Sequence, residues 1–252
     1  MANPVQGVIF DLGGTLMTFI GDWEAVQNEG VGEMLAVFRN QRIALDEAEL
    51  GTAFLNEQRS GFERAARTHR EVTCAEALRT ALQAVGAPVA AFEHIPAAVR
   101  SYFAPEEARW QAFPASRDVL RALATGRGSG AAGLRLAALS NATDDPFIQR
   151  LVNRLGFRPW LSPVWSSALL GWRKPEPEPF LFIAQRWELT PEALVVVGDR
   201  LNADVLGAQR AGMRSVLVTA DEPADNDPYR QTIIPTAVIE HISQLPDVIA
   251  RL

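Results

Sequence analysis

The chain has 252 residues, of which 48% are hydrophobic, and its formal net charge is −6 at pH 7. This length allows one large domain or two small ones with a substantial core, and the acidic balance argues against a nucleic-acid partner. No apolar run reaches the ~18 residues that a membrane span needs. The N-terminus lacks a basic region followed by an apolar run, so we expect no secretory signal. The single cysteine, Cys74, excludes an intrachain disulfide and is expected in the core. A cytoplasmic protein without a membrane partner fits these features.

The first predicted element is a strand over residues 5–10. Its β-branched and aromatic side chains suit a strand that is buried on both faces. Asp11 follows directly, and Gly13 and Gly14 then permit a sharp turn. We therefore expect Asp11 at the carboxyl end of a buried parallel strand, where open α/β sheets bind their ligands. Such an aspartate is a metal ligand, a nucleophile or both, or it simply ends the strand at a turn.

A helical block follows, from about residue 22 to residue 103. Apolar residues recur at helical spacing over 23–40, 47–67, 72–85 and 89–103, and Asp46 is placed to cap the second helix. No stretch in this block has the alternation of a strand. We expect an all-helical insertion of about 85 residues, an ordinary size for a domain.

The rest of the chain alternates between strands and helices. Helices are expected over 116–124, 145–156, 177–188 and 202–212, strands over 134–139, 164–167, 194–197 and 215–219, and a glycine-rich, mobile loop over 126–133. A short apolar run near Val238 and a helix from Ser243 end the chain. This alternation predicts a doubly wound, Rossmann-like parallel sheet with helices on both faces. We expect an α/β core over 1–18 and 105–252 and a helical cap over 19–104.

Polar residues follow several of the expected strands directly. Asp11, Ser140 and Asp199 each come straight after a buried apolar run. Because the carboxyl ends of neighbouring parallel strands lie at one edge, these three side chains are expected in one crevice.

Four stretches carry the chemistry of this crevice, namely DLGGTL at 11–16, LSN at 139–141, GWRKPEP at 171–177 and GDRLNAD at 198–204. In this order they resemble the four motifs of the haloacid dehalogenase-like (HAD) hydrolase superfamily. The predicted helical insertion after the first motif is similar to the cap of one subgroup. The resemblance implies a Mg²⁺-dependent phosphatase that acts on a small phosphorylated metabolite.

The resemblance also implies roles for individual residues. Asp11 would attack phosphorus and form an aspartyl-phosphate. Mg²⁺ takes oxygen ligands, and those implied here are the side chains of Asp11 and Asp199, the carbonyl of Gly13, and Asp204 directly or through water. Ser140 would donate its hydroxyl to a phosphoryl oxygen. The expected phosphate contacts are Thr15, Ser140, Asn141 and Lys174.

Lys174 stands out because it is the only lysine among 24 basic residues. A lone lysine among arginines reflects either a need for a compact ammonium or chance. The resemblance favours the first interpretation, because it places Lys174 beside Asp11 as a second catalytic group. Simpler interpretations stay open. In these interpretations Lys174 is a solvated loop charge, Asp204 caps or pairs on the following helix, and Ser140 and Asn141 form a plain turn.

Other polar side chains near these motifs and in the cap have simpler expectations. Glu176 and Glu178 are expected to be exposed, and Trp172 lines the entrance or packs. The cap arginines are expected to be solvated helix charges, namely Arg59, Arg64 and Arg67.

One residue departs from the family pattern. Gly13 stands where phosphatases of the superfamily carry the aspartate that protonates the leaving alcohol. General acid–base catalysis is worth ~10²–10⁴-fold, so we expect a slow phosphatase that favours good leaving groups. His69 and Asp22 are weak candidates for the missing role, and His69 is expected on a helix surface. A carboxylate restored at position 13 should raise turnover.

This departure leaves an alternative function open. A catalytically weakened member of the family would bind a phosphorylated ligand or a protein partner. Dehalogenases of the superfamily also lack the second aspartate but need no metal, so Asp199 and Asp204 argue against dehalogenation. Phosphonatases use a cap lysine, which is excluded because Lys174 lies in the core motif. The oligomeric state is not indicated.

Overall fold

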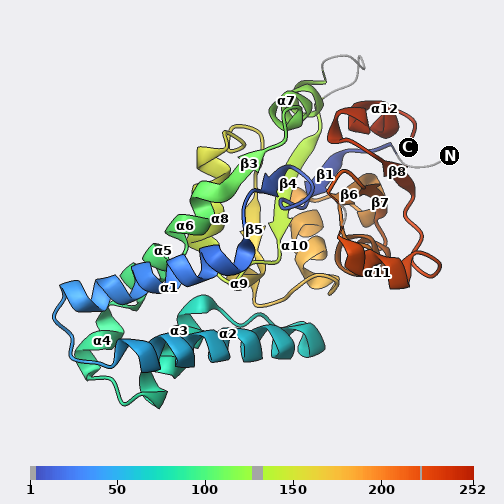
Figure 1. The fold of residues 1–252 in the computed structure, drawn as a ribbon. Helices are drawn as coiled ribbons and strands as arrows, with labels where there is room; N and C mark the ends of the chain where they lie inside the picture. Colours follow the sequence, from blue (N-terminus) through green and yellow to red (C-terminus); the bar gives the residue numbers. More distant parts are fainter. Residues whose placement is uncertain (1–3, 127–132, 222) are drawn as a thin grey trace.

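The computed structural model describes residues 4–126, 133–221 and 223–252. Its centre is a six-stranded parallel sheet in the order β5-β4-β1-β6-β7-β8. The strands are β1 (Gly7–Phe10), β4 (Arg135–Ser140), β5 (Val164–Ser166), β6 (Leu194–Gly198), β7 (Arg214–Val218) and β8 (Ala237–Ile239). The parallel sheet predicted from the sequence is confirmed, and Figure 1 shows β1 at its centre.

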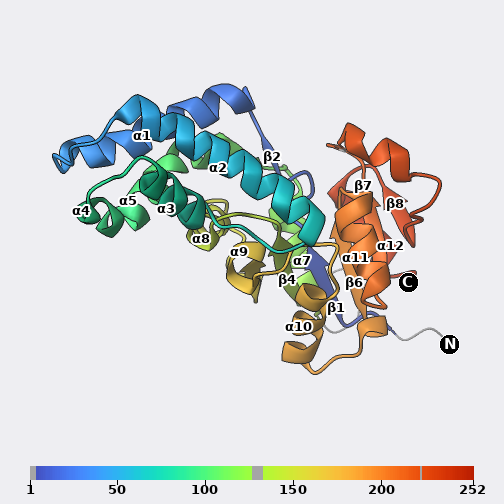
Figure 2. The ribbon, with the colours of Figure 1, turned by 90° about the horizontal axis from the view of Figure 1, so that it is seen from below.

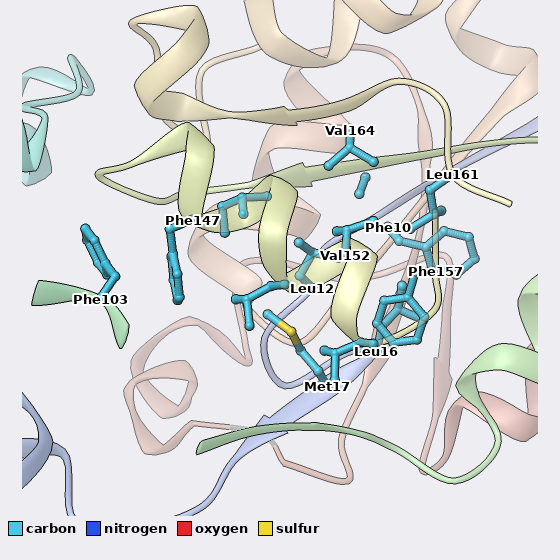
Figure 3. Close-up of a cluster of buried hydrophobic side chains, with 14 of the residues drawn as sticks. Phe10, Leu12, Leu16, Met17, Phe103, Phe147, Val152, Phe157, Leu161 and Val164 are labelled. Carbon is cyan, nitrogen blue, oxygen red and sulfur yellow. The ribbon is translucent and has the colours of Figure 1, made fainter. Parts of the chain in front are cut away.

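Side chains of β1 alternate between two buried layers. Val8 and Phe10 belong to one hydrophobic cluster and Ile9 to another, as the period of two in a strand requires. The first layer is covered by α7 (Ser116–Thr125), α8 (Asp145–Arg154) and α12 (Leu245–Ile249), and the second by α10 (Glu178–Trp187) and α11 (Leu206–Arg210). Figure 3 shows part of the first layer around Phe10. Helices therefore flank both faces, which confirms the doubly wound fold.

Six helices are inserted between the first strand and the rest of the sheet, and we call this set the cap. They are α1 (Trp23–Asn40), α2 (Glu47–Thr68), α3 (Cys74–Ala84), α4 (Val89–Glu93), α5 (Ile95–Tyr102) and α6 (Ala104–Arg109). The first three of these helices each begin at a capping side chain that accepts a hydrogen bond from the first turn, namely Asp22 for α1, Asp46 for α2 and Thr73 for α3. The starts of these helices are therefore determined by local sequence. Figures 1 and 2 show α1 to α5 gathered to one side of the sheet.

The cap is continuous with the core in two ways. A short antiparallel ribbon of β2 (Met17–Phe19) and β3 (Trp110–Ala112) carries the chain into the cap and out again. The rings of Phe103, between α5 and α6, and Phe147 on α8 are stacked with centroids 4.6 Å apart. Both rings are labelled in Figure 3. The exact ends predicted for the cap, residues 19 and 104, stay a prediction. Cys74, on α3, is buried as expected.

Some predicted elements differ from the structure. The helix expected over 89–103 is two helices that meet at His94, because Pro96 lacks the amide that would continue the first one. The helix expected over 202–212 starts as a π-helical turn at Leu201–Val205, in which the amide of Val205 bonds to the carbonyl of Arg200. The strand near 164 ends at Ser166, whose hydroxyl caps an unpredicted helix α9 (Ser167–Leu170).

Three short 3-10 helices complete the described chain, at Pro191–Ala193, Ala224–Tyr229 and Ile242–Gln244. The glycine-rich loop predicted over 126–133 lies mostly outside the described residues. Among the described residues, none of the helices combines the length and apolar character that crossing a membrane requires.

Candidate active site

The carboxyl edge of the sheet and the cap enclose a cavity of about 1110 Å³. The core contributes the ends of β1, β4 and β6 together with the loop before α10. The predicted site residues that line the cavity are Asp11, Gly13, Ser140, Asn141, Lys174 and Asp199. The parallel strands thus bring these distant residues to one edge, as the sequence predicted.

Lys174 is buried at this edge, with only 5% of its surface exposed. Its Nζ donates to Asp11 Oδ1 at 2.5 Å, to Asp204 Oδ1 at 2.7 Å and to the carbonyl of Leu139 at 2.9 Å. Burial lowers the pKa of Lys174, but the carboxylates of Asp11 and Asp204 outweigh burial and hold the pKa above its usual range. Lys174 is therefore a charged ammonium between two carboxylates, and the interpretation as a solvated loop charge is wrong.

Asn141 holds the loop that carries Lys174. Its side-chain amide donates to the carbonyl of Lys174 at 3.0 Å, and its side-chain oxygen accepts from the Lys174 amide at 2.9 Å. This reciprocal pair joins the end of β4 to the loop before α10. Asn141 thus has a positioning role toward Lys174, and its contact with phosphate stays a prediction.

Asp11, Asp199 and Asp204 form a compact acidic cluster. Each offers a carboxylate oxygen, and these oxygens all lie within 4.8 Å of one another. Burial raises the pKa of Asp199, and the neighbouring charges of Asp11 and Asp204 raise it further. Burial likewise raises the pKa of Asp11, with Lys174 opposing the rise. The three carboxylates repel one another, and at Asp199 this repulsion outweighs the attraction of Lys174.

Asp199 is the member of this cluster that bears most directly on metal binding. Its Oδ1 is buried and has no hydrogen-bond partner in the described part of the chain. An unpaired buried carboxylate oxygen is costly, and a divalent cation removes that cost. Mg²⁺ prefers carboxylate oxygens, so the donor set of Asp11, Asp199 and Asp204 fits this ion.

The turn after β1 is shaped around Asp199. Gly14 has φ of +73°, and a Cβ built there would lie 2.4 Å from Asp199 Oδ2. Only glycine combines this backbone conformation with such close approach. The second glycine of the motif therefore makes room for the acidic cluster.

Gly13 has a different neighbour, the ring of Trp110 on β3. A Cβ built on Gly13 would lie 3.1 Å from Trp110 Cη2 and 3.4 Å from Cζ3. The other edge of this ring donates from Nε1 to Glu106 Oε1 at 3.1 Å. A side chain at residue 13 would therefore begin in tight contact with the indole. Trp110 and Glu106 also line the cavity, and neither was identified from the sequence.

Three other predicted residues, Thr15, Asp204 and Asp22, do not line the cavity. Thr15 is fully buried, does not line the cavity, and its hydroxyl has no partner among the residues described. Asp204 is buried, and its Oδ2 accepts from the amide of Arg200 at 3.0 Å while Oδ1 accepts from Lys174. Asp22 accepts from the amide of Ala25 as a helix cap. Asn226, in the 3-10 helix Ala224–Tyr229, donates to the carbonyl of Asp199 at 2.7 Å, a positioning contact that no local pattern marks.

The cap reaches the lysine loop through residues 69–73, which we call the strap. His69 follows the last residue of α2, has a left-handed backbone conformation and lines the cavity. Its Nδ1 lies 2.6 Å from Glu176 Oε1. The predicted place of His69 on a helix surface and the predicted exposure of Glu176 are therefore wrong. The Arg173 amide donates to the His69 carbonyl at 2.8 Å. Arg173 also pairs with the buried Glu71 at 2.8 Å.

Two further expectations concern tryptophan and the cap arginines. Trp172 packs beneath the guanidinium of Arg70, which lies 3.3 Å from the ring centroid. Three cap arginines are exposed and do not line the cavity, in keeping with solvated charges, namely Arg59, Arg64 and Arg67.

Comparison with known proteins agrees with this fold and site. The family model for haloacid dehalogenase-like hydrolases matches residues 5–212. The chain belongs to this family of hydrolases.

Individual relatives are similar to parts of the chain. A glyceraldehyde 3-phosphate phosphatase of Methanopyrus kandleri is 33% identical over 120 residues, 48% of this chain and 51% of that protein. A phosphoglycolate phosphatase of Salmonella paratyphi A is 36% identical over 107 residues, 42% of this chain and 39% of that protein. The match thus spans about half or less of these curated relatives.

A solved structure matches the whole chain. The 2-haloacid dehalogenase of Pseudomonas syringae pv. Tomato has a TM-score of 0.71 and 26% identity, covering 98% of this chain and 99% of that one. Relatives of two chemistries therefore share this fold, and the site residues have to distinguish them.

Proposed function

We propose that this protein is a Mg²⁺-dependent phosphatase of small phosphorylated metabolites with Asp11 as its nucleophile. The observation that carries the proposal is the acidic cluster, in which the buried Asp199 Oδ1 has no hydrogen-bond partner among the described residues. A carboxylate nucleophile that attacks a phosphate dianion needs positive charge beside it. The phosphatase relatives support this chemistry.

The residues divide the reaction between them. Asp11 Oδ attacks phosphorus, the bond from phosphorus to the ester oxygen breaks, and the alcohol leaves. Lys174 holds Asp11 in place by its 2.5 Å hydrogen bond and supplies positive charge to the transferring group. Ser140 lines the cavity, and none of the described residues hydrogen-bonds its hydroxyl, which is available for a phosphoryl oxygen. Water then hydrolyses the acyl-phosphate and restores Asp11.

Bound Mg²⁺ would neutralise the charge between the carboxylates and the phosphoryl oxygens. Asp11, Asp199 and Asp204 would hold the ion, with the carbonyl of Gly13 as a further ligand. Gly13 supplies no acid, so the leaving oxygen takes its proton from water. The protein should therefore favour esters of acidic alcohols.

Release of inorganic phosphate from 4-nitrophenyl phosphate tests the proposal. We expect hydrolysis with MgCl₂ that stops with EDTA, and Asp11→Asn should reduce kcat/KM by at least about 10³-fold. Asp118→Asn makes the same chemical change at an exposed helix position and should match the wild type. Equal rates for Asp11→Asn and the wild type would end the proposal.

A second candidate, dehalogenation, is favoured by the match to the haloacid dehalogenase. Chloride release from 2-chloropropionate, measured beside phosphate release, separates the two reactions. Chloride release without phosphate release would replace our proposal. Binding of inorganic phosphate without either reaction would identify the catalytically weakened ligand-binding protein instead.

A further inference from the structure

The wall that the cap and the β2–β3 ribbon contribute to the cavity is rich in aromatic side chains. Phe19 lies edge-on to Trp23, with ring centroids 4.8 Å apart, and edge-on to Trp110 at 5.5 Å. The aromatic residues from these two segments that line the cavity are Phe19, Trp23, Phe62, Tyr102, Phe103 and Trp110. Such a wall binds apolar groups and also cations that lie over ring faces.

One carboxylate lies in this aromatic wall. Glu106 lines the cavity and accepts a hydrogen bond from Trp110 Nε1 on Oε1. Among the described residues, no lysine, arginine or histidine comes within ion-pair distance of Glu106. In contrast, the arginines that line the cavity from the core each pair with a carboxylate, Arg173 with Glu71, Arg200 with Asp225 and Arg210 with Glu176.

The indole of Trp110 relates this carboxylate to the catalytic residues. Its Cη2–Cζ3 edge approaches Gly13, and its N–H edge bonds to Glu106. The Glu106 carboxylate therefore lies about one indole width beyond Gly13, within the same cavity as Asp11. A ligand with phosphate at Asp11 and a short aliphatic chain spans this interval.

The chemistry of this wall favours a cation over a neutral group. A carboxylate that is largely removed from water needs a positive partner. Aromatic faces attract alkylammonium groups in addition. Burial raises the pKa of Glu106 to about 7, with the Trp110 hydrogen bond opposing the rise, which agrees with a carboxyl group that lacks a cationic partner.

We propose that the cavity binds a phosphate monoester whose leaving group ends in an alkylammonium, with Glu106 as its counter-ion and Trp23 and Trp110 as its aromatic wall. The phosphate end of this assignment rests on the proposed phosphatase function. The ammonium end rests only on the cap wall and is tested separately.

A binding experiment tests the ammonium end without turnover. Tryptophan fluorescence of the full chain is titrated with choline and with 3,3-dimethylbutan-1-ol, a neutral molecule of the same shape. We expect a Kd for choline at least about tenfold lower than for the alcohol. Glu106→Gln should bring the two Kd values within about twofold. Glu63→Gln, an exposed change on α2 that does not line the cavity, should keep the preference.

Equal or weaker binding of choline by the wild type would overturn the assignment, and so would a preference that survives in Glu106→Gln. The wild-type comparison of the two ligands does not depend on how well the variant folds. Failure of choline to bind at all counts against the assignment in the same way.

The matching esters show which proposal fails. Choline phosphate should have a kcat/KM at least about tenfold above that of 3,3-dimethylbutyl phosphate, and this ratio should fall toward one in Glu106→Gln. A binding preference for choline with no hydrolysis of either ester would refute the phosphatase function and leave the ammonium site standing. Equal hydrolysis of both esters would refute the ammonium site and leave the phosphatase function standing.

Discussion

Replacing Lys174 with methionine tests the electrostatics of the site directly. The substitution keeps most of the aliphatic volume and removes the ammonium that hydrogen-bonds to Asp11, Asp204 and the Leu139 carbonyl. Both carboxylates stay in place without their cation. The buried acidic cluster then loses the ammonium that lies between Asp11 and Asp204.

The expected loss in the free energy of unfolding is large. Lys174 is 5% exposed and Asp204 is 1% exposed, so water does not replace the lost partner. Removing one partner of a buried ion pair costs about 3–5 kcal/mol. Mg²⁺ should stabilise Lys174→Met more than the wild type, because the ammonium and a divalent cation compete for the same carboxylates.

Urea unfolding with EDTA and with MgCl₂ measures both effects. Arg39→Met is the matched control, since Arg39 forms an exposed ion pair with Glu47 and its loss should change stability little. A loss below about 1 kcal/mol in Lys174→Met, or a loss equal to that of Arg39→Met, would refute the reasoning. So would a smaller Mg²⁺ effect in the variant than in the wild type.

Three further predictions concern the residues around this centre. Gly14→Ala forces a side chain into the left-handed region, which costs about 1–2 kcal/mol before the clash with Asp199, so thermal unfolding should show lower stability and a metal titration weaker Mg²⁺ binding. Gly13→Asp should lower the free energy of unfolding by about 1–3 kcal/mol through overpacking against Trp110. Turnover of alkyl phosphates should be higher in Gly13→Asp than in the wild type, and higher again in the double variant with Trp110→Leu. Equal turnover in the single and double variants would contradict this. Between pH 4.5 and 7 folded Glu106 holds a proton that the unfolded chain has lost, so its contribution to stability should fall by up to about 3 kcal/mol as pH rises through that window. Urea unfolding at pH 5 and pH 8 should show this fall in the wild type and a smaller one in Glu106→Gln.

The parts of the site that sequence reasoning found are those that strand ends position. Asp11, Ser140 and Asp199 follow buried apolar runs, and a parallel sheet brings such ends together whatever the intervening chain does. Lys174 was marked by its uniqueness among the basic residues. Sheet geometry was sufficient to bring Asp11, Ser140 and Asp199 together, whereas the role of Lys174 came from the family resemblance.

The parts that were missed depend on contacts between distant segments. Trp110 meets Gly13 only because the three-residue strands β2 and β3 pair, and strands this short leave no periodic signal. Glu106 could be related to the site only through its hydrogen bond with the indole of Trp110. The break at His94, by contrast, followed from Pro96 and was readable in the sequence.

The strap of residues 69–73 connects the cap to the core at a second place besides the β2–β3 ribbon, because it bonds to the loop that carries Lys174. A rotation of the cap about the ribbon would break the contacts of His69 with Glu176 and of Glu71 with Arg173. Because the Arg173 amide is hydrogen-bonded to the His69 carbonyl, such a rotation would also displace the backbone next to Lys174. Entry of a ligand into the cavity and the position of the Asp11 carboxylate, which Lys174 holds, are therefore linked through the strap. Loosening the strap would disturb both at once.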